Sequence, residues 1–181
     1  MNNMAWYDKD GLSHYSIGVT KLTGIDLMRE ACAVTIDKPY SEMTLDRIYK
    51  CEHSPIRTQL FWVEMWDIPS FVSVHFVRHK IGVEHFVKSL RDDRCGNGGE
   101  TRDSLVNHSM LINAQALINM ARKRLCSKAH IETQKVMNVL RNEVAGVDPD
   151  LRNYMLPECM YRNGCYESKP CGFYDNQIKG R

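Results

Sequence analysis

The segment TQLFWVEMWDIPSFVSVHFVRHK (residues 58–80) decides the fold, because it predicts a strand followed directly by a helix. Large apolar side chains occupy both sets of alternating positions in residues 58–68, a pattern typical of a strand buried largely on both faces. Pro69 ends this strand and opens a helix that we expect over residues 70–79. Three apolar residues are expected on the core side of that helix: Phe71, Val74 and Val77.

Outward from this segment the sequence predicts mostly helices. β-Branched and aromatic residues predict a second strand over residues 14–22. Apolar residues at helical spacing, with cap and breaker residues at the ends, predict helices over residues 23–34, 41–51, 107–125, 127–144 and 151–156. The helix over residues 107–125 has the clearest apolar stripe. The Gly-rich segment 94–104 predicts a loop. The whole pattern predicts an α+β single domain.

Length and charge limit the possible classes of protein. The 181 residues suffice for one domain with a sizeable core, and a formal net charge of +2 means that any anion site must come from local clustering. The sequence has neither a long apolar run nor a basic N-terminal region followed by an apolar one, so we expect no membrane span and no signal peptide. The seven cysteines are an odd number, and we expect reduced thiols and a cytoplasmic location.

Positive charge gathers in two short runs, residues 78–80 and 122–124. Each run either complements the negative end of a helix dipole or binds phosphate groups, for which arginine is well suited. Ser89 and Arg91 add a hydroxyl and a guanidinium after the first run. Asn113 and Asn119 precede the second run; two asparagines on one predicted helix are either surface residues or ligand contacts.

Four motifs, in their order and spacing, resemble the flavin-dependent thymidylate synthases. They are EHSP (52–55), RHK (78–80), SLR (89–91) and NAQALINMARKR (113–124), and the resemblance covers most of residues 45–145. It implies a single domain over residues 1–157, with helices packed on a small mixed or antiparallel sheet, and a cysteine-containing tail over residues 158–181. The compact, divergent form is typical of a viral, phage-encoded member, which would act in the host cytoplasm.

The resemblance also implies roles for individual residues. Seven residues would contact the flavin cofactor: His53, Ser54, Arg78, His79, Lys80, Asn113 and Asn119. Six would bind the nucleotide substrate: His75, Arg78, Glu84, Ser89, Arg91 and Arg124. Arg124 would in addition be the catalytic arginine that polarises the uracil ring.

The implied reaction is the transfer of a one-carbon unit from methylenetetrahydrofolate to C5 of a pyrimidine deoxynucleotide, dUMP to dTMP. FAD would be the cofactor and NADPH the reductant, and no cysteine nucleophile is needed. Fixed cations would orient the phosphates, and an arginine would stabilise charge that develops on the ring. The resemblance further implies a homotetramer whose sites are shared between subunits.

The sequence departs from the family pattern at several places. Lys80 lacks the planar fork of an arginine, His75 stands in place of a glutamine, and Gln115 in place of an arginine that holds FAD. The segment before Asn113 is about twenty residues, shorter than in the family, and Arg94 or Arg102 would have to replace its phosphate-binding arginine. These departures leave two alternatives open: another pyrimidine reaction such as hydroxymethylation, or a non-catalytic relative that binds nucleotides or nucleic acid.

Three cysteines follow one another at intervals of six residues in the tail: Cys159, Cys165 and Cys171. We expect them to be reduced thiols that pack the tail. A zinc site is the alternative, with Cys126, Cys51 or a histidine as the fourth ligand, although the spacing differs from the usual CxxC. A redox-active pair is a third interpretation.

Overall fold

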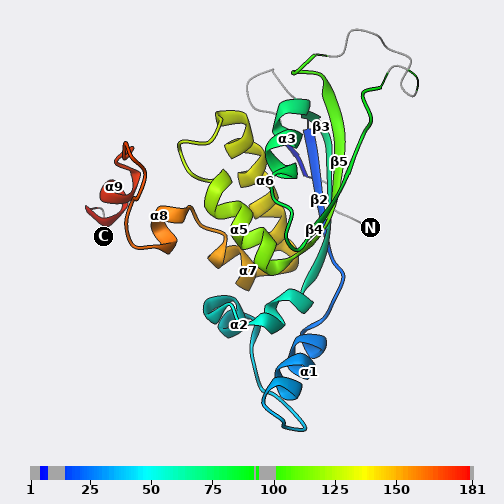
Figure 1. Ribbon diagram of the computed structural model, residues 1–181, viewed down its shortest axis with the longest axis vertical. Helices are drawn as coiled ribbons and strands as arrows, with labels where there is room; N and C mark the ends of the chain where they lie inside the picture. The colour runs from blue at the N-terminus through cyan, green and yellow to red at the C-terminus, as the bar shows by residue number, and fades with distance from the viewer. Residues whose placement is uncertain (1–4, 8–14, 92, 94–100, 180–181) are drawn as a thin grey trace.

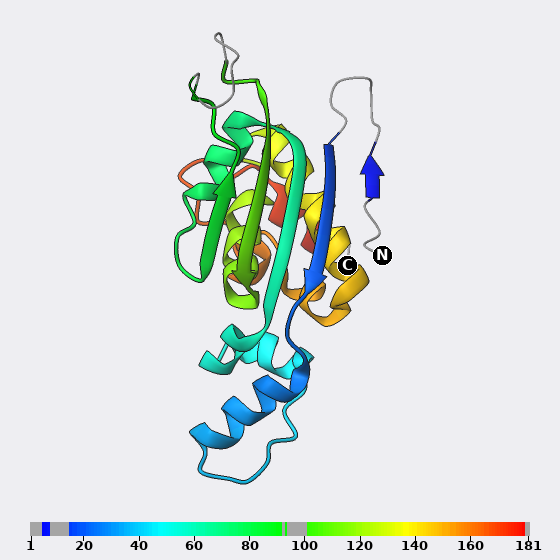
Figure 2. The ribbon, with the colours of Figure 1, turned by 90° about the vertical axis from the view of Figure 1, so that its right-hand side faces the viewer.

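A computed structural model describes residues 5–7, 15–91, 93 and 101–179. Within these residues an antiparallel sheet has the strand order β1-β2-β3-β5-β4 (Figure 2). The strands are β1 (Ala5–Tyr7), β2 (Tyr15–Lys21), β3 (Leu60–Pro69), β4 (Val83–Val87) and β5 (Leu105–Asn113). β3 and β5 are the two long central strands, and they pair with each other over most of their length.

Helices cover one face of this sheet. Figure 1 shows α3, α5 and α6 as a layer on one side, with α1 and α2 beyond one end of the sheet and α8 and α9 on the outer side of the helical layer. The helices are α1 (Ile25–Thr35), α2 (Leu45–Cys51), the 3-10 helix η1 (Ser54–Thr58), α3 (Ser70–Val77), α5 (Ala114–Arg124), α6 (Ile131–Val147), α7 (Pro149–Tyr154), α8 (Glu158–Tyr161) and α9 (Phe173–Lys179). In the described part of the chain no helix has both the length and the apolar character needed to cross a membrane.

Strand β3 is buried on one face, whereas both faces were expected to be buried. Its inward side chains are buried: Phe61, Val63, Met65 and Ile68. The outward side chains face away from the helices, and Trp66 is 38% exposed. Trp62 contacts the ring of Phe86 on β4 across the intervening strand β5, so apolar side chains of β3 and β4 cover one another partly on this open face. The expectation was wrong because helices pack on a single side.

The helix predicted over residues 107–125 is in fact a strand followed by a helix. Val106, His108, Met110 and Ile112 are buried with the period of two that a strand requires, and Asn113 then caps α5. This segment contains so many apolar residues that it fits both the helical period of 3.6 and the strand period of two. Pairing with β3 on one side and β4 on the other favours the strand.

Helix α3 was predicted correctly in position but not in orientation. Its buried residues are Val72, Ser73 and Phe76. Of the three residues expected on the core side, Phe71 packs partly against the core, whereas Val74 is 54% and Val77 36% exposed. Apolar residues occur on every side of the helix, so its hydrophobic pattern does not distinguish one face from another. Strand β4 was not predicted, because its residues lie inside a segment dominated by charge.

The remaining predicted elements are confirmed with shifted ends. β2, α1 and α7 occupy the segments expected for them. Helix α2 begins later than predicted because Thr44 caps it by accepting a hydrogen bond from the amide of Arg47, and α6 begins after its cap residue His130. The loop predicted over residues 94–104 lies largely outside the described residues.

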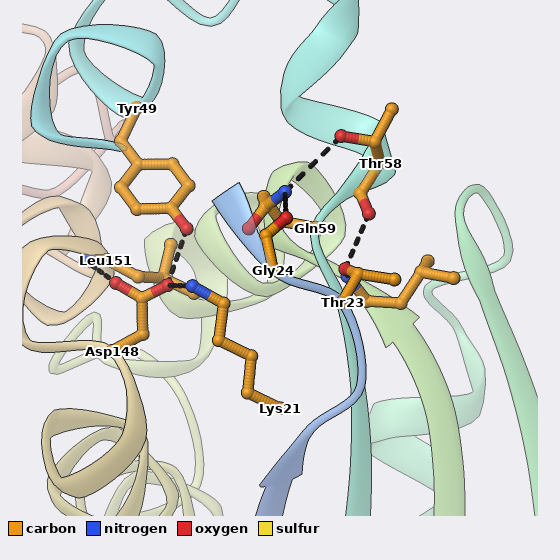
Figure 3. A network of polar contacts seen from close by, with 9 residues as sticks. Lys21, Thr23, Gly24, Tyr49, Thr58, Gln59, Asp148 and Leu151 are labelled. Carbon is orange, nitrogen blue, oxygen red and sulfur yellow. Dashed lines mark hydrogen bonds and ion pairs between the residues drawn. The ribbon is translucent and has the colours of Figure 1, made fainter. Parts of the chain in front are cut away.

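A buried carboxylate ties three elements together at the end of the sheet (Figure 3). The Asp148 side chain is fully buried and accepts a hydrogen bond from the Lys21 ammonium at 2.7 Å and one from the Tyr49 hydroxyl at 2.6 Å. Its other oxygen accepts from the amide of Leu151 and thereby caps α7. β2, α2 and α7 therefore share a single charged partner, whose loss would leave the Lys21 ammonium unpaired.

We predict that Asp148→Ala lowers the free energy of unfolding by about 3–5 kcal/mol, because one partner of a buried ion pair is removed. Urea denaturation monitored by circular dichroism measures the change. The matched control is Asp26→Ala, which removes a carboxylate that is 94% exposed and 4.0 Å from Arg29, and which we expect to change stability by less than about 0.5 kcal/mol. Equal effects of the two substitutions would contradict the account.

Candidate functional site

The C-terminal ends of α3 and α5 meet and bring together four residues that we call the α3–α5 junction: His75, Arg78, His79 and Arg124. Arg124 ends α5 and donates from Nη2 to the carbonyl oxygen of His75 at 2.6 Å. It also donates from Nε to Nε2 of His79 at 3.1 Å. The guanidinium therefore satisfies a carbonyl of the last turn of α3, where helices leave such groups unpaired. The orientation of Arg124 is set by α3.

The junction keeps a neutral histidine beside a fixed cation. Burial, followed by the charge of Arg124, lowers the pKa of His79 to about 4. This agrees with the hydrogen bond, because Nε2 of His79 must be unprotonated to accept from Arg124. Burial also lowers the pKa of Arg124, with a further contribution from the charge of Arg78. Two guanidinium groups thus lie near one another at this end of α3.

His75 attaches the junction to α6. Its Nδ1 lies 2.7 Å from Oγ1 of Thr133, which is fully buried. Its ring lies edge-on to Phe71 and is tilted against the ring of His130. Burial is the main cause that lowers the pKa of His75, followed by the charge of Arg124. The ring of His75 is therefore held in place by neighbours on two helices.

Two cavities open beside the junction, and Arg78 lines both. The first, of about 320 Å³, lies between His75, Phe71 and Arg102. The second, of about 580 Å³, lies between α3 and β4; its walls are mostly apolar, and Lys80 and Lys88 stand at its edge. Among the described residues, none of the cations in these walls is paired with a carboxylate. Together they offer apolar space next to unpaired positive charge, which suits a ligand with both a ring and phosphates.

Beneath the junction a chain of hydrogen bonds runs through the core. Oγ of Ser73 lies 3.0 Å from Nδ1 of His108, Nε2 of His108 lies 2.9 Å from Nδ1 of His85, and Nε2 of His85 lies 2.7 Å from the carbonyl oxygen of His79. A carbonyl only accepts, so Nε2 of His85 carries a proton. With both rings neutral, Nε2 of His108 donates to His85 and the Ser73 hydroxyl donates to His108. The chain therefore holds the backbone at His79, next to Arg78 and Lys80.

Sequence reasoning missed His85 and His108. His108 was assigned to a helix, and only the strand register of β5 turns its ring toward the core with Met110. Once the period of two is recognised, a histidine at a buried position of a strand indicates a polar side chain that needs hydrogen-bond partners in the core.

The flavin-contacting residues expected in the EHSP motif lie elsewhere. His53 and Ser54 line a separate cavity of about 340 Å³ between α1, α2 and η1. The structure therefore does not bring them to the α3–α5 junction within one chain.

Asn113 has a clear structural task. Its side chain accepts a hydrogen bond from the amide of Ala116 at 2.9 Å and so caps α5. The amide group also packs against Gly82, where an added Cβ would lie 2.4 Å from Nδ2 of Asn113. Gly82 has a φ of +75°, so both its conformation and this close approach require glycine.

Asn119 belongs to a polar network on the other side of α5. Its Oδ1 accepts from Nη1 of Arg122 at 3.0 Å and from Nε2 of Gln115 at 3.4 Å. Arg122 forms a close ion pair with Glu52 and stacks on the ring of Tyr161 at 3.4 Å. Gln115 donates to the same carboxylate at 2.6 Å. The network joins α5 to the end of α2, and Asn119 keeps only its Nδ2 group for a ligand.

The last three predicted substrate residues are not gathered at the junction. Glu84 is exposed on β4, on the opposite face from Val83 and His85, and so points away from the helices. The hydroxyl oxygen of Ser89 accepts from the amide of Arg91, and the Arg91 guanidinium binds Asp93 at 2.9 and 2.7 Å in an exposed pair. Arg102, one of the two expected substitutes, does reach the first junction cavity, while Arg94 lies outside the described residues.

We predict that the buried histidine chain makes the fold sensitive to acid. Burial, followed by the charge of His85, lowers the pKa of His108 to about 4 from the ordinary 6.5. Between these values the unfolded chain binds more protons than the folded one, so the free energy of unfolding falls as the pH drops from about 6.5 to about 4. His108→Gln, which keeps hydrogen-bonding groups, should flatten this part of the profile.

Urea denaturation at a series of pH values measures the effect. His53→Gln, which replaces an exposed histidine, is the control and should follow the slope of the unmodified protein. Parallel pH profiles for all three proteins would overturn the role given to His108.

Comparison with known proteins places the fold. Neither a family model nor a curated protein matches the sequence. Solved structures do match. Thymidylate Synthase X (ThyX) from Helicobacter pylori with FAD and dUMP aligns with a TM-score of 0.58 and 14% identity over 78% of this chain and 98% of that chain. A second structure of that flavin-dependent enzyme, also complexed with FAD and dUMP, gives a TM-score of 0.58 and 17% identity over 76% and 99% of the two chains.

A third structure, the UMP/dUMP methylase PolB from Streptomyces cacaoi bound with 5-Br dUMP, gives a TM-score of 0.61 and 12% identity over 79% and 95% of the two chains. Identities this low establish the fold alone. The prediction of an α+β single domain with helices packed on an antiparallel sheet is confirmed. The chain therefore has the fold of the ThyX thymidylate synthases and of a related nucleotide methylase.

Proposed function

We propose that this protein is an FAD-dependent enzyme that transfers a one-carbon unit from methylenetetrahydrofolate to C5 of a pyrimidine deoxynucleotide, converting dUMP to dTMP. One observation carries the proposal: in a ThyX-like fold, Arg124 is fixed beside a neutral His79 and next to the unpaired cation Arg78. This arrangement suits a site that holds phosphates and polarises a ring.

The residues present fit FAD in their chemistry. Its diphosphate needs cations that are not already neutralised, and Arg78 and Lys80 are exposed and unpaired among the described residues. Its ring system needs apolar surface, which Val74 and Val77 provide in the cavity beside them. When bound, the reduced flavin would supply hydride, with NADPH as the source of reducing equivalents. Asn113 and Asn119 would contribute side-chain amides, and His53 and Ser54 would contact the cofactor bound by a neighbouring subunit.

The nucleotide site that we propose combines Arg124 with the cations around it. Within the described residues Nη1 of Arg124 makes no hydrogen bond, so this group is free to donate to a pyrimidine oxygen. Negative charge that develops on the pyrimidine ring during the reaction would be stabilised by this fixed guanidinium without reorganisation. His75, Glu84, Ser89 and Arg91 complete the set assigned to the substrate by the resemblance.

We further propose that the enzyme is a homotetramer with sites shared between subunits. Two observations support sharing. His53 and Ser54 lie apart from the junction within one chain, and the open sheet face exposes Trp66 and Phe86, the latter by 54%. Light scattering should give the mass of a tetramer, and a monomeric mass for an active enzyme would exclude the tetramer.

We also propose that residues 1–157 form the catalytic domain. The protein would act in the cytoplasm, which for a viral protein is that of the host.

We predict that Arg124→Ala retains FAD but lowers kcat by about 10²–10³-fold, the usual cost of removing a group that stabilises developing charge. Turnover is followed with dUMP, methylenetetrahydrofolate and NADPH, and the product is identified by mass spectrometry. Because Arg124 also caps α3, Arg124→Lys is made in parallel, and thermal unfolding checks that both variants fold. Arg47→Ala, which removes an exposed arginine of α2, is the control and should leave kcat unchanged.

Normal turnover by Arg124→Ala would show that another group polarises the ring. A product heavier by a hydroxymethyl group would support the proposed site but show that the reaction is hydroxymethylation. An unmodified protein that binds polynucleotide in a salt-sensitive way, yet turns over no free nucleotide, would favour the non-catalytic alternative.

A further inference from the structure

The C-terminal tail has almost no core of its own. Neither α8 nor α9 contains a buried residue, and no residue beyond Met155 belongs to the hydrophobic core of the described chain. Figure 1 shows both helices on the outer side of α5, away from the sheet. A short segment without a core is stabilised by a disulfide, a metal site or contacts with another subunit.

Four cysteines from separate parts of the chain line one cavity of about 160 Å³: Cys126, Cys159, Cys165 and Cys171. Cys126 follows the end of α5, Cys159 lies in α8, and the other two lie in the irregular segment before α9. The tail thus contributes its three cysteines, and the body of the protein contributes one. None of the four is buried, so the expectation that they serve to pack the tail does not account for their convergence.

The surroundings favour thiolate character. The Ser127 hydroxyl donates to Sγ of Cys171 at 2.8 Å, and this hydrogen bond is the main cause that lowers the pKa of Cys171. The charge of Lys128, which lines the same cavity, also lowers the pKa of Cys171. Burial raises the pKa of Cys159, and the nearby thiols of Cys126 and Cys165 raise it further, because neighbouring thiolates repel each other. A divalent cation among the sulfurs would remove that repulsion.

We propose that these four cysteines bind a structural zinc ion that fastens the tail to the end of α5. Four thiolates are a common tetrahedral ligand set for zinc, with Zn–S distances of about 2.3 Å. Zinc with four thiolates carries a charge of −2. Glu158 and Glu167 line the cavity beside the cations, and Glu158 already pairs with Lys123 and Arg162. Within the described residues Lys128 is therefore the lining cation that remains to offset the charge of the site. Binding releases the protons of those thiols that are still protonated.

The sulfurs must move together for this to happen. Within the described residues, no group of three or more His, Cys, Asp or Glu side chains is arranged as a metal site. Cys159, Cys165 and Cys171 lie at the cavity wall on a segment with no core, and the proposal requires that this segment and its side chains shift toward Cys126 when the metal binds. Metal binding would then order the tail, as coupled metal binding and folding does in small zinc domains.

A disulfide is the competing cross-link for the same residues. All six described cysteines are free thiols, and an intracellular enzyme is kept reduced. A single disulfide would use two of the four cysteines and leave no reason for the other two to line the cavity. Convergence of four therefore favours zinc over a redox pair.

Metal analysis of the full-length protein, purified without chelator, tests the proposal. We expect one zinc per chain, and after exchange with cobalt the visible bands of a tetrahedral thiolate complex. Cys171→Ser and Cys126→Ser should lose stoichiometric zinc after the same dialysis, whereas Cys51→Ser, an exposed cysteine of α2, should keep it. Mass spectrometry without reductant counts disulfides in the same samples.

Loss of zinc should also make the tail sensitive to protease, with cleavage after residue 157 while the body stays intact. A metal-free protein with four freely reactive thiols would overturn the proposal, and so would a disulfide between any two of the four. Zinc content does not depend on flavin or nucleotide, so failure here is distinguishable from failure of the proposed enzyme activity. If a Cys→Ser variant does not fold, the metal content and cobalt spectrum of the unmodified protein still decide the question.

Discussion

The antiparallel pairing of β3 with β5 is the constraint on which the rest of the structure depends. Each strand is followed at once by a helix, α3 after Pro69 and α5 after Asn113. Pro69 pairs with Leu105, and Asn113 pairs with Leu60, so the two helices start at opposite ends of the sheet. Both pack on the same face and run toward each other, and their C-terminal ends meet. The strand register therefore builds the α3–α5 junction.

The meeting of two helix C-termini explains why positive charge gathers there. Each end presents unpaired carbonyl groups and the negative end of a helix dipole, and both favour cations. The two interpretations of the basic runs are thus compatible. Arg124 satisfies a carbonyl of α3 and Arg122 holds Glu52, while Arg78 and Lys80 stay unpaired among the described residues and can serve a ligand. The helix ends thus account for the position of the cations, and the proposed chemistry uses the two that have no carboxylate partner among the described residues, Arg78 and Lys80.

How far the sequence predicted the structure depended on whether one hydrophobic period dominated. The fold class, β2, β3 and the position of α3 followed from clear patterns. The segment around His108 was misassigned because apolar residues satisfied both periods, and only pairing across the sheet decides between them. Of the candidate site, His75, Arg78, His79 and Arg124 could be named from motifs. The hydrogen-bond chain beneath them could not be predicted from the sequence, because Ser73, His85 and His108 meet only through tertiary contacts.

The central claim is that the α3–α5 junction binds a flavin and a pyrimidine nucleotide in one site. Its most direct test is the visible absorption spectrum of the purified protein with added FAD, followed by titration with dUMP. The account predicts a protein-bound flavin spectrum that dUMP perturbs in a saturable way, because both ligands would share the cations around Arg78 and Arg124. A protein that retains no flavin, or a bound flavin whose spectrum does not respond to dUMP, would contradict it.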